Sequence, residues 1–139
     1  MKVGIIGAGT MGAGIAQAFA ATDGYDVILC DMSLELAQKG VDRIKGKLDK
    51  AVAKGRVEQG AANAIMASVR AGEHADLSGC ELVVEAAIEN MDIKKRLFAD
   101  LTKICPDNVL FATNTSSLSI TELGRGLERP GVGMHFFNP

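Results

Sequence analysis

Short apolar runs alternate with longer segments of helical periodicity along the chain. The runs place Val, Ile, Leu and Ala on consecutive positions, which is typical of strands that are buried on both faces of a parallel sheet. Strands are expected at residues 3–6, 26–30, 69–71, 81–86, 108–112 and 131–136. Helices are expected at residues 10–21, 34–54, 57–69, 92–105 and 119–127. Strands that alternate with helices indicate parallel βαβ units with helices on both faces of one sheet.

The segment between residues 33 and 69 is longer than an ordinary crossover connection. Ser33 is a suitable N-cap for its first helix, and Gly55 is a suitable terminator after Lys54. A second helix then runs back, so the segment predicts a helical hairpin inserted into the fold. One face of the first helix is basic, and two interpretations stay open for it: a solvated surface, or an arm that contacts phosphate. That face consists of Lys39, Arg43, Lys47, Lys50 and Lys54.

The composition is that of one ordinary globular domain. The 139 residues are 47% hydrophobic and 23% charged, with a formal net charge of −2. This charge balance gives no reason to expect binding to nucleic acid or to a membrane surface. No apolar run reaches the ~18 residues that a membrane-spanning helix needs. The first strand follows Met1 and Lys2 directly, without the pattern of a targeting peptide, so we expect a cytoplasmic protein with one domain over residues 1–139.

The cysteines predict neither a metal site nor a disulfide framework. Cys30, Cys80 and Cys105 are odd in number and lie at wide, unpatterned spacing. We expect three buried free thiols in a reducing compartment.

The first predicted strand ends in a glycine-rich turn, Gly7-Ala8-Gly9-Thr10-Met11-Gly12, which has the pattern G-x-G-x-x-G. We interpret Gly7 as allowing the tight turn, Gly9 as letting a pyrophosphate approach the backbone, and Gly12 as letting the next helix pack closely. The N–H groups at the start of that helix then face the phosphates, and Thr10 offers a hydroxyl contact. The turn itself has no basic side chain.

An acidic residue stands where a dinucleotide site needs one. Asp31 follows Gly12 by 19 residues and ends the second predicted strand. A carboxylate at this place accepts hydrogen bonds from the ribose hydroxyls and repels a 2′-phosphate, which favours NAD over NADP. The alternative is structural: the glycines serve only a tight turn, and Asp31 caps the following helix.

Polar clusters follow the later strands and are expected at the same edge of the sheet, because ligands of doubly wound sheets bind outside the carboxyl ends of the strands. Three segments, together with the glycine-rich turn, resemble the L-3-hydroxyacyl-CoA dehydrogenase family, and within it the bacterial 3-hydroxybutyryl-CoA dehydrogenases. They are Val83-Val84-Glu85-Ala86-Ala87, Asn114-Thr115-Ser116-Ser117-Leu118 and His135-Phe136-Phe137-Asn138-Pro139. The resemblance covers the whole chain and implies a Rossmann-type, doubly wound α/β fold with a mostly parallel sheet and the helical hairpin as an insertion.

The resemblance also implies a reaction and its residues. The family oxidises a 3-hydroxyacyl-CoA reversibly to the 3-ketoacyl-CoA with NAD as cofactor. His135 matches the general base, for which imidazole is suited by its pKa of ~6.5. Ser116 matches the serine that hydrogen-bonds the reacting oxygen. Further matches line the cofactor or contact the acyl-CoA substrate: Glu89, Lys94, Asn114 and Asn138 for the former, and Lys54, Lys47 and Asn138 for the latter.

The family continues for more than a hundred residues beyond the segment matched here. That remainder holds a helical domain, the homodimer interface, a Glu that orients the catalytic His, and an Asn that polarises the substrate carbonyl. We therefore expect the 139 residues alone to bind NAD with little or no turnover. His74 has no flanking motif and is expected to be a surface or packing residue, and Glu85 is expected to be structural.

Two other readings stay open. The chain could be a non-catalytic NAD-binding or redox-sensing module, which would need neither His135 nor Ser116. A 3-hydroxyacid dehydrogenase of the 6-phosphogluconate type shares a similar glycine-rich start, but the segment from His135 to Pro139 does not suit that group.

Overall fold

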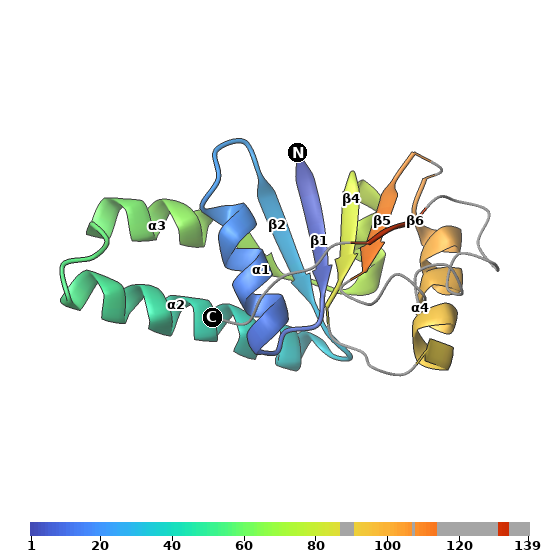
Figure 1. Ribbon diagram of the computed structural model, residues 1–139, viewed down its shortest axis with the longest axis horizontal. Coiled ribbons are helices and arrows are strands. Elements are labelled where there is room, and N and C mark those ends of the chain that lie inside the picture. Colours follow the sequence, from blue (N-terminus) through green and yellow to red (C-terminus); the bar gives the residue numbers. More distant parts are fainter. Residues whose placement is uncertain (87–90, 107, 114–130, 134–139) are drawn as a thin grey trace.

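The computed structural model is a twisted parallel sheet with helices on both faces (Figure 1). It describes residues 1–86, 91–106, 108–113 and 131–133. The six strands lie in the order β3-β2-β1-β4-β5-β6, and every neighbouring pair is parallel. The strands are β1 Lys2–Ile6, β2 Asp26–Cys30, β3 Val69–Ala71, β4 Leu82–Glu85, β5 Leu110–Thr113 and β6 Gly131–Gly133. The helices are α1 Thr10–Ala20, α2 Leu34–Ala53, α3 Gln59–Ala67 and α4 Met91–Ile104, with a 3₁₀ helix η1 at His74–Gly79.

This topology confirms the predicted doubly wound α/β fold. The chain builds outward from β1 in both directions, through β2 and β3 on one side and through β4, β5 and β6 on the other. The order reverses beside β1, which creates a crevice at the carboxyl ends of the strands. The second helix of the hairpin is shorter than predicted because Glu58 is still extended and Val69 already belongs to β3. The sequence did not predict η1, and the helix expected at residues 119–127 lies outside the described residues.

Successive side chains of a strand point to opposite faces of the sheet, so the strands contribute to two separate hydrophobic cores. Val3 and Ile5 point to the α1 face, where they pack with small aliphatic residues of α1, α2 and α3. Gly4 faces the other side, and a Cβ there would lie 2.3 Å from Leu77 Cδ2 of η1. That side also holds α4, whose Phe98 packs on Phe111 of β5 with ring centroids 5.5 Å apart.

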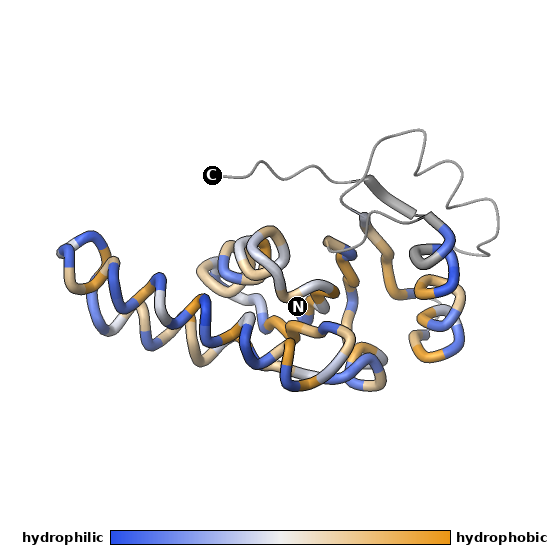
Figure 2. The backbone as a smooth tube through the Cα atoms, turned by 90° about the horizontal axis from the view of Figure 1, so that it is seen from below, coloured by the Kyte–Doolittle hydropathy of each residue, from blue (hydrophilic) through white to orange (hydrophobic). Residues whose placement is uncertain are grey.

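The predicted helical hairpin is confirmed and extends well beyond the edge of the sheet (Figure 1). The Ser33 hydroxyl accepts a hydrogen bond from Leu36 N at 3.2 Å, as an N-cap does. Gly55 ends the first helix with a φ of +72°, a conformation that favours glycine. Figure 2 shows hydrophilic and hydrophobic residues alternating along both helices, as expected for amphipathic helices with one face in contact with the protein.

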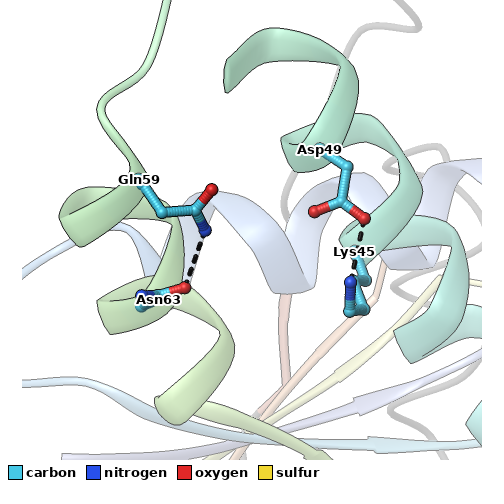
Figure 3. A network of polar contacts seen from close by, with 4 residues as sticks. All are labelled: Lys45, Asp49, Gln59 and Asn63. Atoms are coloured by element: carbon cyan, nitrogen blue, oxygen red, sulfur yellow. Dashed lines mark hydrogen bonds and ion pairs between the residues drawn. The ribbon is translucent and has the colours of Figure 1, made fainter. Parts of the chain in front are cut away.

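The outer surface of the hairpin is stabilised mainly by local polar pairs. Lys45 Nζ lies 2.9 Å from Asp49 Oδ2 on α2, and Gln59 Nε2 donates to Asn63 Oδ1 at 2.9 Å on α3 (Figure 3). Such i,i+4 pairs contribute about 0.2–0.5 kcal/mol each. These pairs are typical of a solvated surface. A solvated surface is one of the two interpretations given above for the basic face of the first helix.

The three cysteines are buried free thiols, as predicted. Burial raises the pKa of the Cys30 thiol to about 12, and the neighbouring Cys80 and Asp76 add to the shift. Burial likewise raises the pKa of Cys80 to about 11. Within the described ranges, no three His, Cys, Asp or Glu side chains are arranged to hold a metal ion. Every helix in these ranges is also too short or too polar to span a lipid bilayer.

Candidate cofactor site

A cleft of about 510 Å³ opens at the carboxyl ends of the strands, where the strand order reverses. It draws residues from both faces of the sheet, because the turn after β1 leads to α1 on one face while η1 and α4 cover the other. The described residues that line it are Ile6, Gly9, Thr10, Met11, Gly12, Asp31, Met32, His74, Ala86 and Leu97.

The glycine-rich turn forms one wall of this cleft. Gly7 has a φ of +112°, and its N–H donates to Cys30 O at 2.8 Å, so the turn starts against the end of β2. Among described residues, no heavy atom lies within 4 Å of where a Gly9 Cβ would be, which leaves that stretch of backbone open to a ligand. A Cβ on Gly12 would instead lie 1.6 Å from the carbonyl oxygen of Gly7. Gly12 is therefore required by the closeness of α1 to the turn itself.

The start of α1 is suited to a negative ligand. Gly9 is the N-cap and has no side chain with which to cap the helix, and within the described residues the first N–H groups of α1 have no hydrogen-bond partner. The helix dipole adds a partial positive charge at the same place. An open backbone, amides available for hydrogen bonding and a helix N-terminus together fit a pyrophosphate.

Asp31 is held beside the turn by two backbone hydrogen bonds. Its Oδ2 accepts from Ala8 N at 2.8 Å, and its Oδ1 accepts from Met32 N at 2.7 Å. Each carboxylate oxygen has a second lone pair, so the half-buried group can still accept hydrogen bonds from a ribose. The alternative reading of Asp31 as a helix cap is wrong, because Ser33 caps α2.

Arg43 is a charged residue near the turn that the glycine motif did not reveal. Its Nη1 donates to Thr10 Oγ1 at 3.3 Å, although 33 residues separate the two in the chain. The approach is possible because Gly40 brings α2 against the turn, where a Cβ would lie 2.6 Å from Ala8 Cβ. A guanidinium therefore lies next to the first turn of α1.

The structure records no polar contact between the glycine turn and the other described residues of the basic helix face. Lys39 is paired with Glu35 at 4.0 Å, and Lys47 and Lys54 are exposed. Eleven residues separate Arg43 from Lys54, which is about 16 Å along a helix. The two side chains are therefore too far apart to contact one phosphate group together.

The opposite wall consists of side chains from β1, η1, α4 and the segments after β2 and β4. Met32 is 92% exposed at the mouth of the cleft, and Ala86 and Leu97 are half-buried. His74 is also half-buried, and its Nε2 is closed off from solvent without a hydrogen-bond partner among the described residues. An unsatisfied buried polar atom costs about 1–3 kcal/mol. The sequence predicted a surface or packing role for this histidine, whereas the structure places it in the cleft wall.

A hydrogen bond between Glu85 and Thr113 links the carboxyl ends of the neighbouring strands β4 and β5. They are register partners on β4 and β5, and Thr113 Oγ1 donates to Glu85 Oε2 at 2.7 Å. Both side chains are almost fully buried. The contact supports the structural role that was expected for Glu85.

Several predicted site residues are not tested by this geometry. Lys94 belongs to α4, but its side chain lies outside the described residues. The others that lie outside the described residues are Glu89, Asn114, Ser116, His135 and Asn138. The structure thus brings together Gly7, Ala8, Gly9, Thr10, Met11, Gly12 and Asp31, which are the residues of the predicted cofactor site that it describes.

Comparisons with known proteins identify the family of this chain. The family model described as "3-hydroxyacyl-CoA dehydrogenase, NAD binding domain" matches residues 2–139. The chain is 41% identical to the 3-hydroxybutyryl-CoA dehydrogenase of Clostridioides difficile, with all of this chain and 50% of that protein covered. It is 39% identical to the 3-hydroxyadipyl-CoA dehydrogenase of Escherichia coli, with 99% of this chain and 29% of that protein covered.

Solved structures show the same likeness. The (S)-3-hydroxybutyryl-CoA dehydrogenase PaaH1 from Ralstonia eutropha superimposes with a TM-score of 0.92 at 40% identity, covering 99% of this chain and 50% of that one. The chain thus spans half or less of the length of these relatives. The glycine turn, the carboxylate at the end of β2 and the family match lead to one conclusion: the chain belongs to the NAD-binding domain family of the 3-hydroxyacyl-CoA dehydrogenases, which are oxidoreductases.

Proposed function

We propose that this chain is the cofactor-binding part of an enzyme that transfers a hydride between a short-chain 3-hydroxyacyl-CoA and NAD. The observation that supports this most strongly is the cleft, in which the open glycine turn and the Asp31 carboxylate lie side by side. Relatives named 3-hydroxybutyryl-CoA dehydrogenase, matched over the whole chain, support 3-hydroxybutyryl-CoA as the substrate.

Each part of the described wall has a role in holding the dinucleotide. The amides at the start of α1 hydrogen-bond the pyrophosphate, and the Arg43 guanidinium adds a positive charge beside them. Asp31 accepts hydrogen bonds from the adenosine ribose. Its negative charge also disfavours a 2′-phosphate, so NAD binds more tightly than NADP.

The reaction needs a base and a group that positions the reacting oxygen. When bound, NAD accepts a hydride from C3 of the hydroxyacyl group. His135 takes the proton of the C3 hydroxyl, and Ser116 hydrogen-bonds the same oxygen. Glu89, Lys94, Asn114 and Asn138 line the cofactor, and Lys47 and Lys54 of the hairpin contact the coenzyme A phosphates. These assignments rest on the family resemblance of the segments that contain them.

Assayed alone, the 139 residues are expected to bind NAD with little or no turnover. The resemblance places an orienting glutamate and a carbonyl-polarising asparagine beyond residue 139, and a base without its orienting partner loses orders of magnitude in rate. Dimerisation through the family's helical domain is part of the same proposal. Oxidation of NADH with acetoacetyl-CoA by the 139 residues alone, at a rate typical of the whole family, would contradict the expected low turnover.

A calorimetric titration with NAD and NADP tests the cofactor site. Wild type is expected to bind NAD more tightly, and Asp31→Ala is expected to weaken NAD binding by about 1–3 kcal/mol, because a hydrogen bond to a charged group is lost. Asp23→Ala, which removes an exposed carboxylate from the loop before β2, is the matched control and should bind NAD as wild type does. Tighter binding of NADP would overturn the role of Asp31.

The alternative of a non-catalytic NAD-binding module is distinguished by the catalytic residues that the resemblance implies. In the protein joined to its family's helical domain, His135→Ala should abolish hydride transfer while leaving the affinity for NAD within about twofold of wild type. Equal hydride transfer by this variant and wild type would favour a different base, and no hydride transfer by wild type would favour a binding module.

A further inference from the structure

His74 is the feature of the cleft that the fold alone does not explain. It begins η1, lines the cleft and is half-buried, while its Nε2 lacks both solvent and a hydrogen-bond partner among the described residues. Buried polar atoms in folded proteins are nearly always hydrogen-bonded, so each exception calls for a specific explanation. A ligand that enters the cleft would supply one.

The position of His74 is set by contacts on the residues just before it. Gly72 N donates to Leu29 O at 3.0 Å, and Cys30 Sγ donates to Glu73 O at 3.6 Å. A Cβ on Gly72 would lie 2.5 Å from Ile28 Cγ2, so the chain passes tightly over β2 here. These contacts place His74 at the carboxyl end of β2, beside the residue that binds the ribose in the proposed function.

The start of η1 is also held from the other side. Glu73 and Asp76 form a capping box, in which Asp76 Oδ2 accepts from Glu73 N at 2.9 Å. The backbone of His74 is therefore fixed between β2 and a capped helix, whereas the terminal torsion of its ring is broad. Rotation of the imidazole about that torsion needs no movement of the backbone, and it is the motion by which a ring nitrogen would reach a ligand in the cleft.

The surroundings of His74 suit a flat base with a polar edge. Four apolar side chains line the same cleft as Asp31 and His74, namely those of Ile6, Met32, Ala86 and Leu97. The base of a dinucleotide is bonded to the same ribose that Asp31 would hold, so it must enter this part of the cleft. Adenine has two apolar faces and an edge with hydrogen-bond donors and acceptors, and a neutral imidazole can donate or accept.

We propose that His74 hydrogen-bonds the adenine ring of the dinucleotide and is a residue that determines the affinity of the cleft for adenosine. This inference rests on the proposed function, because it takes NAD as the ligand. The alternative is that the histidine ring only packs against η1 and the base. The two differ in one respect: packing needs the ring, whereas a hydrogen bond needs the nitrogen.

Titration of the 139-residue chain and its variants with ADP-ribose and NAD tests the proposal. His74→Phe keeps an aromatic ring without nitrogen, and should weaken both ligands by about three- to tenfold. His74→Gln keeps a polar atom at the distance of Nε2, and should bind within about twofold of wild type. His74→Leu also removes the ring nitrogens, with a smaller side chain, and should weaken binding of both ligands as much as His74→Phe does. It keeps the test valid if the larger ring prevents folding.

Melting of the ligand-free variants gives a readout that does not depend on activity. His74→Phe or His74→Leu removes an unsatisfied buried nitrogen, so the ligand-free chain should be as stable as wild type or more stable while its affinity falls. Phenylalanine and leucine variants that bind ADP-ribose as wild type does would overturn the role of His74 and leave the cofactor site intact. Failure of wild type to bind NAD at all would instead contradict the proposed function.

Discussion

The two walls of the cleft are built in different ways. On the α1 side, the wall is backbone: Gly9 leaves its surface open, and Gly12 has no space for even one extra carbon. On the η1 and α4 side, the wall is side chains, with His74 among the apolar Ala86 and Leu97. The difference shows how one cleft handles two parts of a ligand. In the proposed function, the phosphates are bound by backbone amides whose geometry depends on Gly12, whereas the adenine base is bound by side chains.

The largest expected effect tests the backbone wall. Gly12→Ala places a Cβ 1.6 Å from Gly7 O, so it should destabilise the chain by about 3 kcal/mol or more and abolish NAD binding. Gly14→Ala is the control in the same helix, since a Cβ there would meet no heavy atom of the described chain within 4 Å. It should stabilise the chain by about 0.5–1 kcal/mol. Denaturant unfolding measures both, and equal stabilities of the two variants would contradict the close approach.

The same wall is supported from behind by α2. In Gly40→Ala the new Cβ would lie 2.6 Å from Ala8 Cβ and 2.8 Å from Leu29 Cδ2, which should destabilise the chain by about 1–2 kcal/mol. Gly46→Ala, on the exposed side of the same helix, has space at the new Cβ in the described chain and should stabilise it. The free energy of unfolding should fall in Gly40→Ala and rise in Gly46→Ala, as measured by denaturant unfolding. A change in the same direction in both variants would show that α2 does not pack tightly against the turn.

The thiol of Cys30 donates a hydrogen bond to Glu73 O, just before His74 in the side-chain wall. Its titration makes the stability of the chain depend on pH. Burial raises the pKa of this thiol from 9.0 to about 12 in the folded chain. Above about pH 9 the unfolded chain therefore binds fewer protons than the folded chain, and the free energy of unfolding falls as the pH rises. Below about pH 8 this thiol adds no pH dependence.

Cys30→Ala isolates that contribution. Between about pH 8 and about pH 10, wild type should lose about 1 kcal/mol more stability than the variant, as measured by denaturant unfolding at each pH. Parallel pH profiles for the two proteins would show that the thiol titrates normally in the folded chain.

The smallest expected effect concerns the charge beside the backbone wall. Arg43→Ala should weaken NAD binding by about two- to fivefold, because the guanidinium is exposed and its attraction to phosphate is screened. The loss should shrink as salt is added. Lys39→Ala removes the same charge one helical turn away, from a residue paired with Glu35, and should leave affinity unchanged. Equal losses in both variants would show only a general effect of net charge.

This contrast between the walls explains what the sequence could predict. The backbone wall requires glycine, so Gly7, Gly9 and Gly12 are visible as a spaced pattern, and Asp31 is found by its distance from them. The helical hairpin was predicted in the same way, from periodicity with Ser33 and Gly55 at its ends.

His74 could not be assigned to the cleft from local pattern, and for Arg43 the sequence showed only its place on the basic helix face. Arg43 reaches the turn only because α2 folds against Ala8. His74 reaches the cleft only because β3 pairs with β2. Neither residue type is required at its position by backbone geometry. A signal for η1 existed in the spacing of Glu73 and Asp76, which is that of a capping box, but the segment is too short to show periodicity.

The most direct test of NAD binding in the cleft is an NMR titration of the labelled chain with NAD, following each backbone amide. The largest shifts are expected at Gly9, Thr10, Met11 and Gly12, with further shifts at Met32 and His74. A smaller hollow of about 180 Å³ lies at the other end of the sheet, beside Lys2 and Asp26. Shifts confined to that hollow, with the glycine turn unchanged, would show that NAD does not bind in the cleft.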